Sequence, residues 1–507
     1  MGTAARSRAL TPRGAYATAL KAFSLPVWSN SAHADVASLA SASSKRPRQA
    51  NAYYARFQSA IRIRPSLAKS PILTRKEVIN HMKNLDVLTT LFVGIDVSSQ
   101  TNVAYAMDFH SNKLLEITVP NNHSGATTLA DGVCDLMEGT AFEAVVFAME
   151  STSFYGVHIA NFLSSYPRML GFRPYVHCVN PKLVANYRKS FVGLDKTDAK
   201  DAFVIADFAR VGRITTAPWR GSQYLALQRL TRHRLHLVEC LVREKNYMAA
   251  NVFLKFSELA TLKKSDHPFS SNFTATAEAM LTEFFSPEDI ASMPTDDLVT
   301  FLCEKSRGRF ADPSAVADIL KHAAADSYRL DKILYEPLNT AIASSFNCIS
   351  AFGKEIKTVD KAIERLAVGQ SGNEYQILKS IPGIGPVFAS GILAEIGSGS
   401  AFRSHDALAK YAGLVWRRNQ SGDFEADDTP MSKAGNRYLR YYLIEAAGSV
   451  ARYVPEYADF YQKKHDEVKT HQHKRALALT ARKLVRLIYG LLAKDQLFTP
   501  DKVGGTS

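Results

Sequence analysis

The chain has 507 residues, of which 46% are hydrophobic and 22% charged, and its formal net charge is +14. This length allows two to four globular domains with cores of their own. No apolar run approaches the ~18 residues that a membrane-spanning helix requires, which argues against a membrane protein. The five cysteines are scattered and form no C-x-x-C pair, so the sequence predicts neither a disulfide framework nor a zinc site and fits a reducing cytoplasm.

The positive charge is concentrated near the N-terminus. Residues 1–76 hold thirteen Lys or Arg and a single acid, Asp35, whereas the rest of the chain holds 49 basic and 47 acidic residues. Residues 1–85 show no hydrophobic period, so we expect a basic, disordered leader. Its composition resembles an organelle transit peptide, but translation that begins at Met82 is the simpler explanation.

Residues 86–224 predict a mixed α/β domain. Three short apolar runs with short connections indicate an antiparallel meander, and alternating helices and strands follow. The expected strands are residues 91–97, 103–108, 114–119, 144–149 and 174–179, and the expected helices are residues 126–137 and 155–163. This order is typical of a mixed sheet covered by helices.

Four carboxylates in this domain are candidate metal ligands. Asp96 and Glu150 end two of the strands, and Asp198 and Asp201 lie three residues apart on a predicted helix. Residues three apart share a helix face, and this face continues through Ile205 and Phe208, so we expect both aspartates to point towards the core. Buried like charges are costly unless a cation compensates them, and carboxylate oxygens favour Mg²⁺ or Mn²⁺.

Two such ions ~4 Å apart can stabilise the attacking and leaving oxygens of a phosphodiester, which makes phosphodiester chemistry the expected reaction. The alternative is that these acids are N-caps, turn residues and solvated helix charges. For any one of the four we would favour that alternative, but not for all four in this order on this strand pattern.

Residues 225–372 predict a helical region. It contains two rows of apolar residues at helical spacing, one with regular intervals of 3-4-3-4-3 residues and an earlier one with less regular intervals. A helix with such an apolar row, or seam, requires a partner helix. The first consists of Ile349, Phe352, Ile356, Val359, Ile363 and Leu366, and the second of Leu227, Leu230, Leu237 and Leu241. The residues between them include loop-like pieces at 264–272 and 308–313, which predict an insertion. An intramolecular hairpin and a dimer-forming coiled coil fit the seam equally well.

Residues 373–507 predict a mainly helical C-terminal domain that opens with a glycine turn. Gly383 and Gly385 precede an apolar helix expected over residues 387–396. They allow backbone N–H groups to open a helix N-terminus, which suits a phosphate. The arrangement resembles a helix-hairpin-helix, a sequence-independent binder of nucleic-acid backbones, although a turn with packing glycines fits it equally well. Residues 432–507 hold fourteen Lys or Arg and seven acids, which is typical of phosphate contact and also of a solvated helix face.

Five motifs together resemble a known family. They are Gly94–Ser98, Met149–Thr152, Lys196–Ala202, Tyr411–Gly422 and Met431–Arg437. They resemble the DEDD transposases of bacterial insertion sequences, the insertion sequence one-ten family, which includes pilin-gene-inverting recombinases. The resemblance covers the chain from near residue 90 to near residue 495. It implies a ribonuclease H-like domain similar to the Holliday-junction resolvase RuvC, with Asp96, Glu150, Asp198 and Asp201 as its four acids.

The resemblance also implies that Ser421 is the nucleophile. Ser432 is the competitor because Lys433 lies beside it; by itself, a Ser-Gly pair such as Ser421-Gly422 would be read as a turn. A serine needs activation to attack phosphorus, and the metal or the neighbouring Arg417 and Arg418 could stabilise the charge that develops.

Nucleic-acid contacts are expected from Gly383, Gly385, Arg417, Arg418, Lys433 and Arg437. The loop after Ser421 departs from many relatives because it is acidic, and this argues against direct DNA contact there. Its acids are Asp423, Glu425, Asp427 and Asp428.

The expected function is that of a metal-dependent DNA transposase or site-specific recombinase that cleaves and rejoins donor and target DNA through a phosphoserine intermediate. The resemblance adds a structured non-coding guide RNA, a dimer or tetramer of the chain, and a place at the bacterial nucleoid. No helix-turn-helix or zinc finger is evident, which suits recognition by RNA. The alternatives are a junction-resolving nuclease with the same acids, an actin-like sugar kinase, which would need a Gly-rich phosphate loop that the sequence lacks, and a non-catalytic nucleic-acid binder.

Overall fold

A computed structural model describes most of the chain from residue 85 to residue 500. The described residues are 85–151, 154–214, 219, 222–370, 373–397, 402–416, 420–421, 424–425 and 430–500, with the backbone alone at 222, 223, 370, 420, 421, 424 and 425. Residues 1–84 of the expected leader, together with Arg417 and Arg418, therefore lie outside the described residues.

The N-terminal domain is built on one five-stranded sheet in the order β3-β2-β1-β4-β5. Its strands are β1 (Thr90–Val97), β2 (Thr101–Met107), β3 (Lys113–Pro120), β4 (Ala144–Glu150) and β5 (Pro174–Val179). β1, β2 and β3 pair antiparallel, whereas β4 runs parallel to both β1 and β5. The meander and the mixed sheet predicted from the sequence are confirmed.

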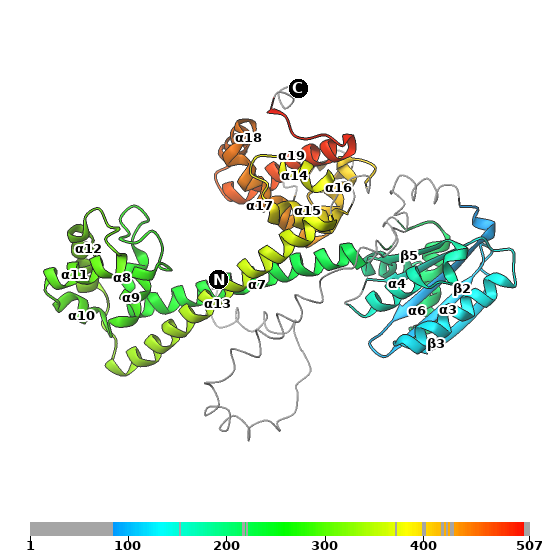
Figure 1. The fold of residues 1–507 in the computed structure, drawn as a ribbon, viewed down its shortest axis with the longest axis horizontal. Coiled ribbons are helices and arrows are strands. Elements are labelled where there is room, and N and C mark those ends of the chain that lie inside the picture. The colour runs from blue at the N-terminus through cyan, green and yellow to red at the C-terminus, as the bar shows by residue number, and fades with distance from the viewer. Residues whose placement is uncertain are drawn as a thin grey trace, which may run out of the picture. The chain divides into compact units, whose positions relative to one another are not determined.

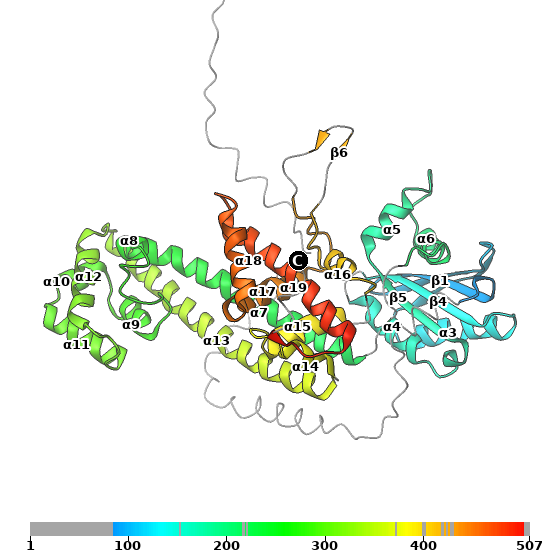
Figure 2. The ribbon, with the colours of Figure 1, turned by 90° about the horizontal axis from the view of Figure 1, so that it is seen from above.

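Helices cover both faces of this sheet. α3 (His123–Glu138) and α4 (Tyr155–Ser165) lie on one side, and α5 (Pro181–Arg188) and α6 (Asp198–Arg210) lie on the other (Figure 2). The odd-numbered residues of β1 and β4 pack against α3 and α4, and their even-numbered residues pack against α6. This follows from the alternation of side chains along a strand, because both faces of these strands are buried. Two short 3₁₀ turns, Val87–Thr89 and Met169–Phe172, complete the domain.

Two long helices form an antiparallel hairpin within the chain. α7 (Ser222–Lys255) and α13 (Lys332–Gln370) run side by side, and the segment between them forms five helices at the joined ends (Figure 1). The predicted seam is present, with Ile363 fully buried and Ile356 almost so. α7 is its partner helix, so the intramolecular hairpin predicted as one of the two possibilities is confirmed.

The predicted insertion has a core of its own. Its helices are α8 (Ser257–Thr261), α9 (Ala275–Glu283), α10 (Pro287–Ser292), α11 (Thr295–Ser306) and α12 (Pro313–Asp326). Thr274 and Asp312 cap α9 and α12 through their side chains, and Ser286 opens α10 with a capping box. The core between these helices is closed by Phe256 of the hairpin's α7 end and Ile342 of α13.

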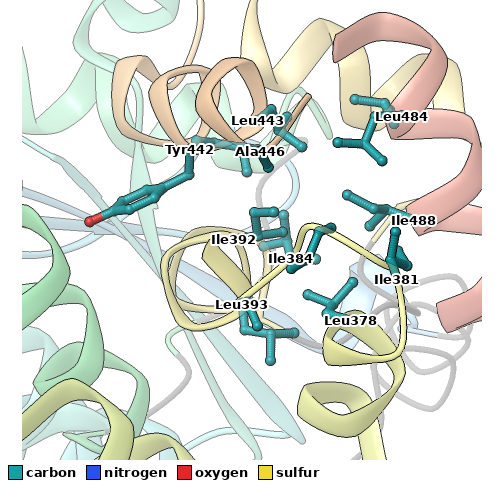
Figure 3. Packing of buried hydrophobic residues seen from close by; sticks show 14 of the residues in the cluster. Leu378, Ile381, Ile384, Ile392, Leu393, Tyr442, Leu443, Ala446, Leu484 and Ile488 are labelled. Atoms are coloured by element: carbon teal, nitrogen blue, oxygen red, sulfur yellow. The ribbon is translucent and has the colours of Figure 1, made fainter. Parts of the chain in front are cut away.

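The C-terminal module is helical and also contains one short hairpin. Its elements are α14 (Asn373–Lys379), α15 (Pro386–Ile396), α16 (His405–Ala412), β6 (Gln420–Ser421), β7 (Phe424–Glu425), α17 (Arg437–Tyr453), α18 (Pro455–Asp466) and α19 (Gln472–Lys494). Ile392 of α15 packs with Leu443 of α17 and Ile488 of α19 (Figure 3). Leu227 of α7 and Ile363 of α13 belong to the same core, so the long hairpin and this module share one hydrophobic cluster.

Two further findings concern the cysteines and the hydropathy of the helices. All five cysteines are free. None of the described helices combines the length and the apolar character that crossing a membrane requires.

Candidate active site

The first part of the site lies where β1 and β4 end. Because the two strands are parallel and Ile95 pairs with Met149, the next residues, Asp96 and Glu150, lie beside each other at the same edge of the sheet. Both belong to the even-numbered rows that face α6. The sheet therefore places two carboxylates side by side on the face that α6 covers.

Gly94 allows α6 to lie directly on β1. A methyl group at Gly94 would collide with the backbone of Ala202 and Ala206, so no residue with a side chain fits there without displacing the helix. This close approach brings the first turn of α6 to the edge that carries Asp96. Thr197 fixes the start of that turn, because its hydroxyl accepts a hydrogen bond from the Lys200 N–H.

Three of the four acids act on one another electrostatically. Burial raises the pKa of Asp96, and the neighbouring Asp198 carboxylate raises it further. Burial, followed by the charge of Asp96, raises the pKa of Glu150. Each proton is held more tightly because burial disfavours the ionised carboxylate, and the charge of the neighbouring carboxylate disfavours it further.

The prediction that the Asp198 side chain points towards the core is wrong. We expected both helix aspartates to point towards the core, but Asp198 is exposed, and Asp201 is only partly buried. The reason is that Asp198 is the first residue of α6, whereas the part of α6 that packs on the sheet begins at Ala202. Asp198 therefore lies at the open rim of the site.

Asp201 has a partner that the sequence reasoning missed. It forms an ion pair with Arg188, the last residue of α5, and the same guanidinium lowers the pKa of Asp96. The sequence signal for this partner was a basic residue at the end of the helix that precedes the Lys-Thr-Asp motif. Arg188 supplies positive charge to a group of acids that would otherwise be uncompensated.

The four acids suit a divalent metal by their chemistry. Hard cations take carboxylate oxygens, and a cation would relieve the repulsion that raises the pKa values of Asp96 and Glu150. Within the described parts of the chain, however, no three Asp, Glu, His or Cys side chains lie close enough to hold a metal ion as they stand.

The glycine turn between α14 and α15 has a clear packing role. Gly383 has φ +95°, and a Cβ there would lie 2.8 Å from the Cα of Val450 in α17. Gly383 thus allows the turn to touch the backbone of α17, as the packing alternative supposed. Gly385 is the N-cap residue of α15 and has open space beside it. The predicted phosphate contacts of both glycines stay predictions.

Ser421 lies in β6, which pairs with β7; we call this strand pair, together with the bridge between Trp416 and Met431 at its base, the serine hairpin. Gln420 and Ser421 pair with Phe424 and Glu425, and the two ends of the hairpin pair as Trp416 with Met431. The base continues one step further, where the Ser432 N–H donates to the Val415 carbonyl at 2.8 Å. The described part of Ser421 is its backbone alone.

The segment that follows the hairpin is held tightly. The Ser432 hydroxyl accepts from the Ala434 N–H, which is a local turn contact, and Arg440 donates to the Lys433 carbonyl. Lys433 itself is exposed, with φ +49°. Arg437 forms an ion pair with Glu239 of α7 at 2.7 Å.

The segments that contain the row of acids and the helical module match two models of known transposase families. Residues 93–256 match the family described as a DEDD transposase of the IS110 type, and residues 375–462 match the transposase family IS116/IS110/IS902. The chain is therefore an enzyme of the DNA transposase and recombinase class. Within that class it belongs to the IS110 transposases, as the resemblance of its motifs predicted.

The proteins that are similar to this chain support the assignment. A 44.8 kDa protein of insertion element IS116 from Streptomyces clavuligerus is 25% identical over 81% of this chain and 96% of its own length. The transposase for insertion sequence element IS1111A from Coxiella burnetii is 25% identical over 46% of this chain and 68% of its own length. The pilin gene-inverting protein of Moraxella bovis is 33% identical over 24% of this chain and 38% of its own length.

Proposed function

We propose that the chain cleaves and rejoins DNA strands through a covalent bond between Ser421 and DNA. The observation that carries the proposal is the row of acids at the edge of a mixed sheet, in a chain that also holds the serine hairpin. The sheet order and the position of the acids support a ribonuclease H-like domain. We also propose that the chain acts on donor and target DNA with a structured guide RNA, as an oligomer at the nucleoid.

In the proposed reaction the Ser421 hydroxyl attacks a phosphodiester. A bond forms between Oγ and phosphorus, the bond to one DNA oxygen breaks, and the proton of the hydroxyl ends on the released DNA hydroxyl. Because the phosphoserine bond conserves the energy of the broken phosphodiester, the hydroxyl of another strand can reverse the step without ATP. Transfer to water would instead leave a nick.

The acids have a distinct part in this proposal. Asp96, Glu150, Asp198 and Asp201 would hold the divalent metal, which when bound would stabilise the charge on the attacked phosphate. Arg188 holds Asp201 in place through their ion pair. The rim position of Asp198 leaves this side of the site open to a DNA strand.

The nucleophile can be identified by trapping. Labelled target DNA is mixed with the protein and guide RNA in Mg²⁺, and the reaction is stopped under denaturing conditions. We expect a protein–DNA adduct with the wild type and with Ser432→Ala, and none with Ser421→Ala. Ser432→Ala is the matched control, because both serines lie in the same segment of the chain.

The other outcomes decide between the alternatives. An adduct that persists in Ser421→Ala and disappears in Ser432→Ala moves the nucleophile to Ser432. Nicked DNA without any adduct favours the junction-resolving nuclease, which uses the same acids and water.

A further inference from the structure

One carboxylate of the C-terminal module is buried and is not among the four acids of the site. Glu395 lies in the last turn of α15 and is 2% exposed. α15 holds no other charged residue, so a lone acid inside it was a signal in the sequence that such a residue needs partners. A buried carboxylate without them would cost several kcal/mol.

Glu395 receives hydrogen bonds from three side chains of two other segments. Arg232 of α7 donates Nε to Oε1 at 2.8 Å and Nη2 to Oε2 at 2.9 Å. Gln228, also of α7, donates to Oε2 at 3.2 Å. Asn436, from the segment after the serine hairpin, donates its Nδ2 to Oε2 at 2.7 Å. Glu395 therefore joins α7 to the start of α17.

Asn436 is the link between Glu395 and the serine hairpin. Its Oδ1 caps α17 by accepting from the N–H groups of Tyr438 and Leu439, while its own N–H donates to the Tyr411 carbonyl at 2.7 Å. The Asn436 amide can donate from Nδ2 to Glu395 and accept at Oδ1 from the α17 N–H groups in one orientation only. The hydrogen bond to Glu395 and the helix cap therefore depend on each other. Asn436 lies four residues after Ser432, whose N–H closes the base of the hairpin.

Both strands at the base of the hairpin are thereby anchored. Arg440 adds two hydrogen bonds of 3.0 Å, one to the Ala412 carbonyl before the hairpin and one to the Lys433 carbonyl after it. Gly435 fits only because it has no side chain, since a Cβ would lie 2.5 Å from the Tyr411 carbonyl oxygen. These contacts fix the segment from Ser432 to Asn436 to the end of α16, and the hydrogen bond between Asn436 and Glu395 fixes the same segment to α15.

We propose that Glu395 is a positioning residue for DNA cleavage: through Asn436 it fixes the base of the serine hairpin to α7 and so sets where Ser421 is presented. The inference rests on the proposed role of Ser421. Glu395 does not touch DNA in this proposal, and Arg232 serves to neutralise and orient it.

Two double variants separate positioning from simple stability. Arg232→Met with Glu395→Gln and Arg232→Met with Glu395→Leu both remove the buried charge pair. They differ in whether residue 395 can accept a hydrogen bond from Asn436. Replacing a buried ion pair by groups of similar volume is often neutral for stability, so both variants are expected to fold.

Three measurements are made on the full chain: thermal unfolding, amide hydrogen exchange, and adduct formation with target DNA. We expect similar unfolding midpoints for both variants. Loss of a hydrogen bond to the anchor should speed exchange at the Ser432 and Asn436 amides by about tenfold in the Leu variant. Adduct formation should slow by about tenfold or more in the Leu variant and stay within about threefold of wild type in the Gln variant, while noncovalent DNA binding is unchanged in both.

Equal exchange and equal adduct formation in the two variants would overturn the proposal. If the Leu variant does not fold, Asn436→Ser takes its place, because serine still caps a helix but cannot reach Glu395. It should show the same faster exchange at Ser432, and unchanged exchange there would also overturn the proposal. A wild type that forms no adduct contradicts the role of Ser421, but the exchange measurement still decides whether Glu395 anchors the hairpin.

Discussion

Asp198 and Asp195 form a matched pair for testing the acid site. Both are exposed aspartates in the same short segment, but Asp198 raises the pKa of Asp96, whereas the backbone carbonyl of Asp195 accepts a hydrogen bond from Arg188. We predict that Asp198→Asn reduces DNA cleavage by about 100-fold or more, because it removes a charge from the site. Asp195→Asn should leave cleavage within about twofold, since surface substitutions are usually mild.

The measurement is cleavage of labelled DNA in Mg²⁺, with thermal unfolding as the check on folding. Both variants should unfold near the wild-type midpoint. Cleavage at the wild-type rate by folded Asp198→Asn would show that this acid takes no part in the reaction.

At the scale of single residues, the sequence predicted the acids at the strand ends better than the acids on the helix. Asp96 and Glu150 could be found because each ends an apolar strand, and parallel strands bring their ends together. The exposure of Asp198 depends on where α6 first touches the sheet, which the period of three residues does not reveal. Arg188 and Glu395 were missed because their partners, Asp201 and Asn436, come from other elements.

The contact between α6 and β1 is the element-scale feature on which the acid site depends. Gly94→Ala should destabilise the N-terminal domain by roughly 2–4 kcal/mol, because a methyl group there collides with the backbone of α6. Gly132→Ala in α3 is the control. The nearest atom that its methyl group would meet is a side-chain carbon of Leu115 at 4.0 Å, and alanine is the better helix former, by about 0.5–1 kcal/mol.

Denaturant unfolding of the two variants tests this contrast. We expect Gly94→Ala to lower the midpoint and Gly132→Ala to hold or raise it. If Gly94→Ala is as stable as the wild type, α6 does not pack on β1 as closely as described, and the first turn of α6 would not reach the edge with Asp96.

Elements were predictable where burial leaves a regular pattern. Strand β5 was predicted with its observed bounds because it is a compact apolar run. The insertion was recognised only by its loops, although Thr274, Ser286 and Asp312 are capping residues that mark three helix starts. Those helices are short, and short helices depend on tertiary packing more than on their own period.

At the scale of the whole molecule, the long hairpin and the C-terminal module share one hydrophobic core and depend on each other for folding. Leu227 of α7 and both Ile363 and Ala367 of α13 are buried in the core that α15, α17 and α19 form. The Tyr442 hydroxyl of α17 donates to the Thr231 carbonyl of α7 at 2.7 Å, and it is buried there. The division predicted between residues 372 and 373 therefore separates residues that share a core.

This predicts how fragments of the chain behave. A fragment of residues 373–500 should not unfold cooperatively, because it lacks the side chains that cover its core and leaves Glu395 without Arg232 and Gln228. Leaving a buried carboxylate unpaired costs about 3–5 kcal/mol, which is a large share of the stability of a small domain. A fragment of residues 222–500 keeps α7 and α13 and is the control, and we expect it to unfold cooperatively. Circular dichroism during heating and limited proteolysis measure both, and a cooperative transition of residues 373–500 at the same midpoint as residues 222–500 would contradict the shared core.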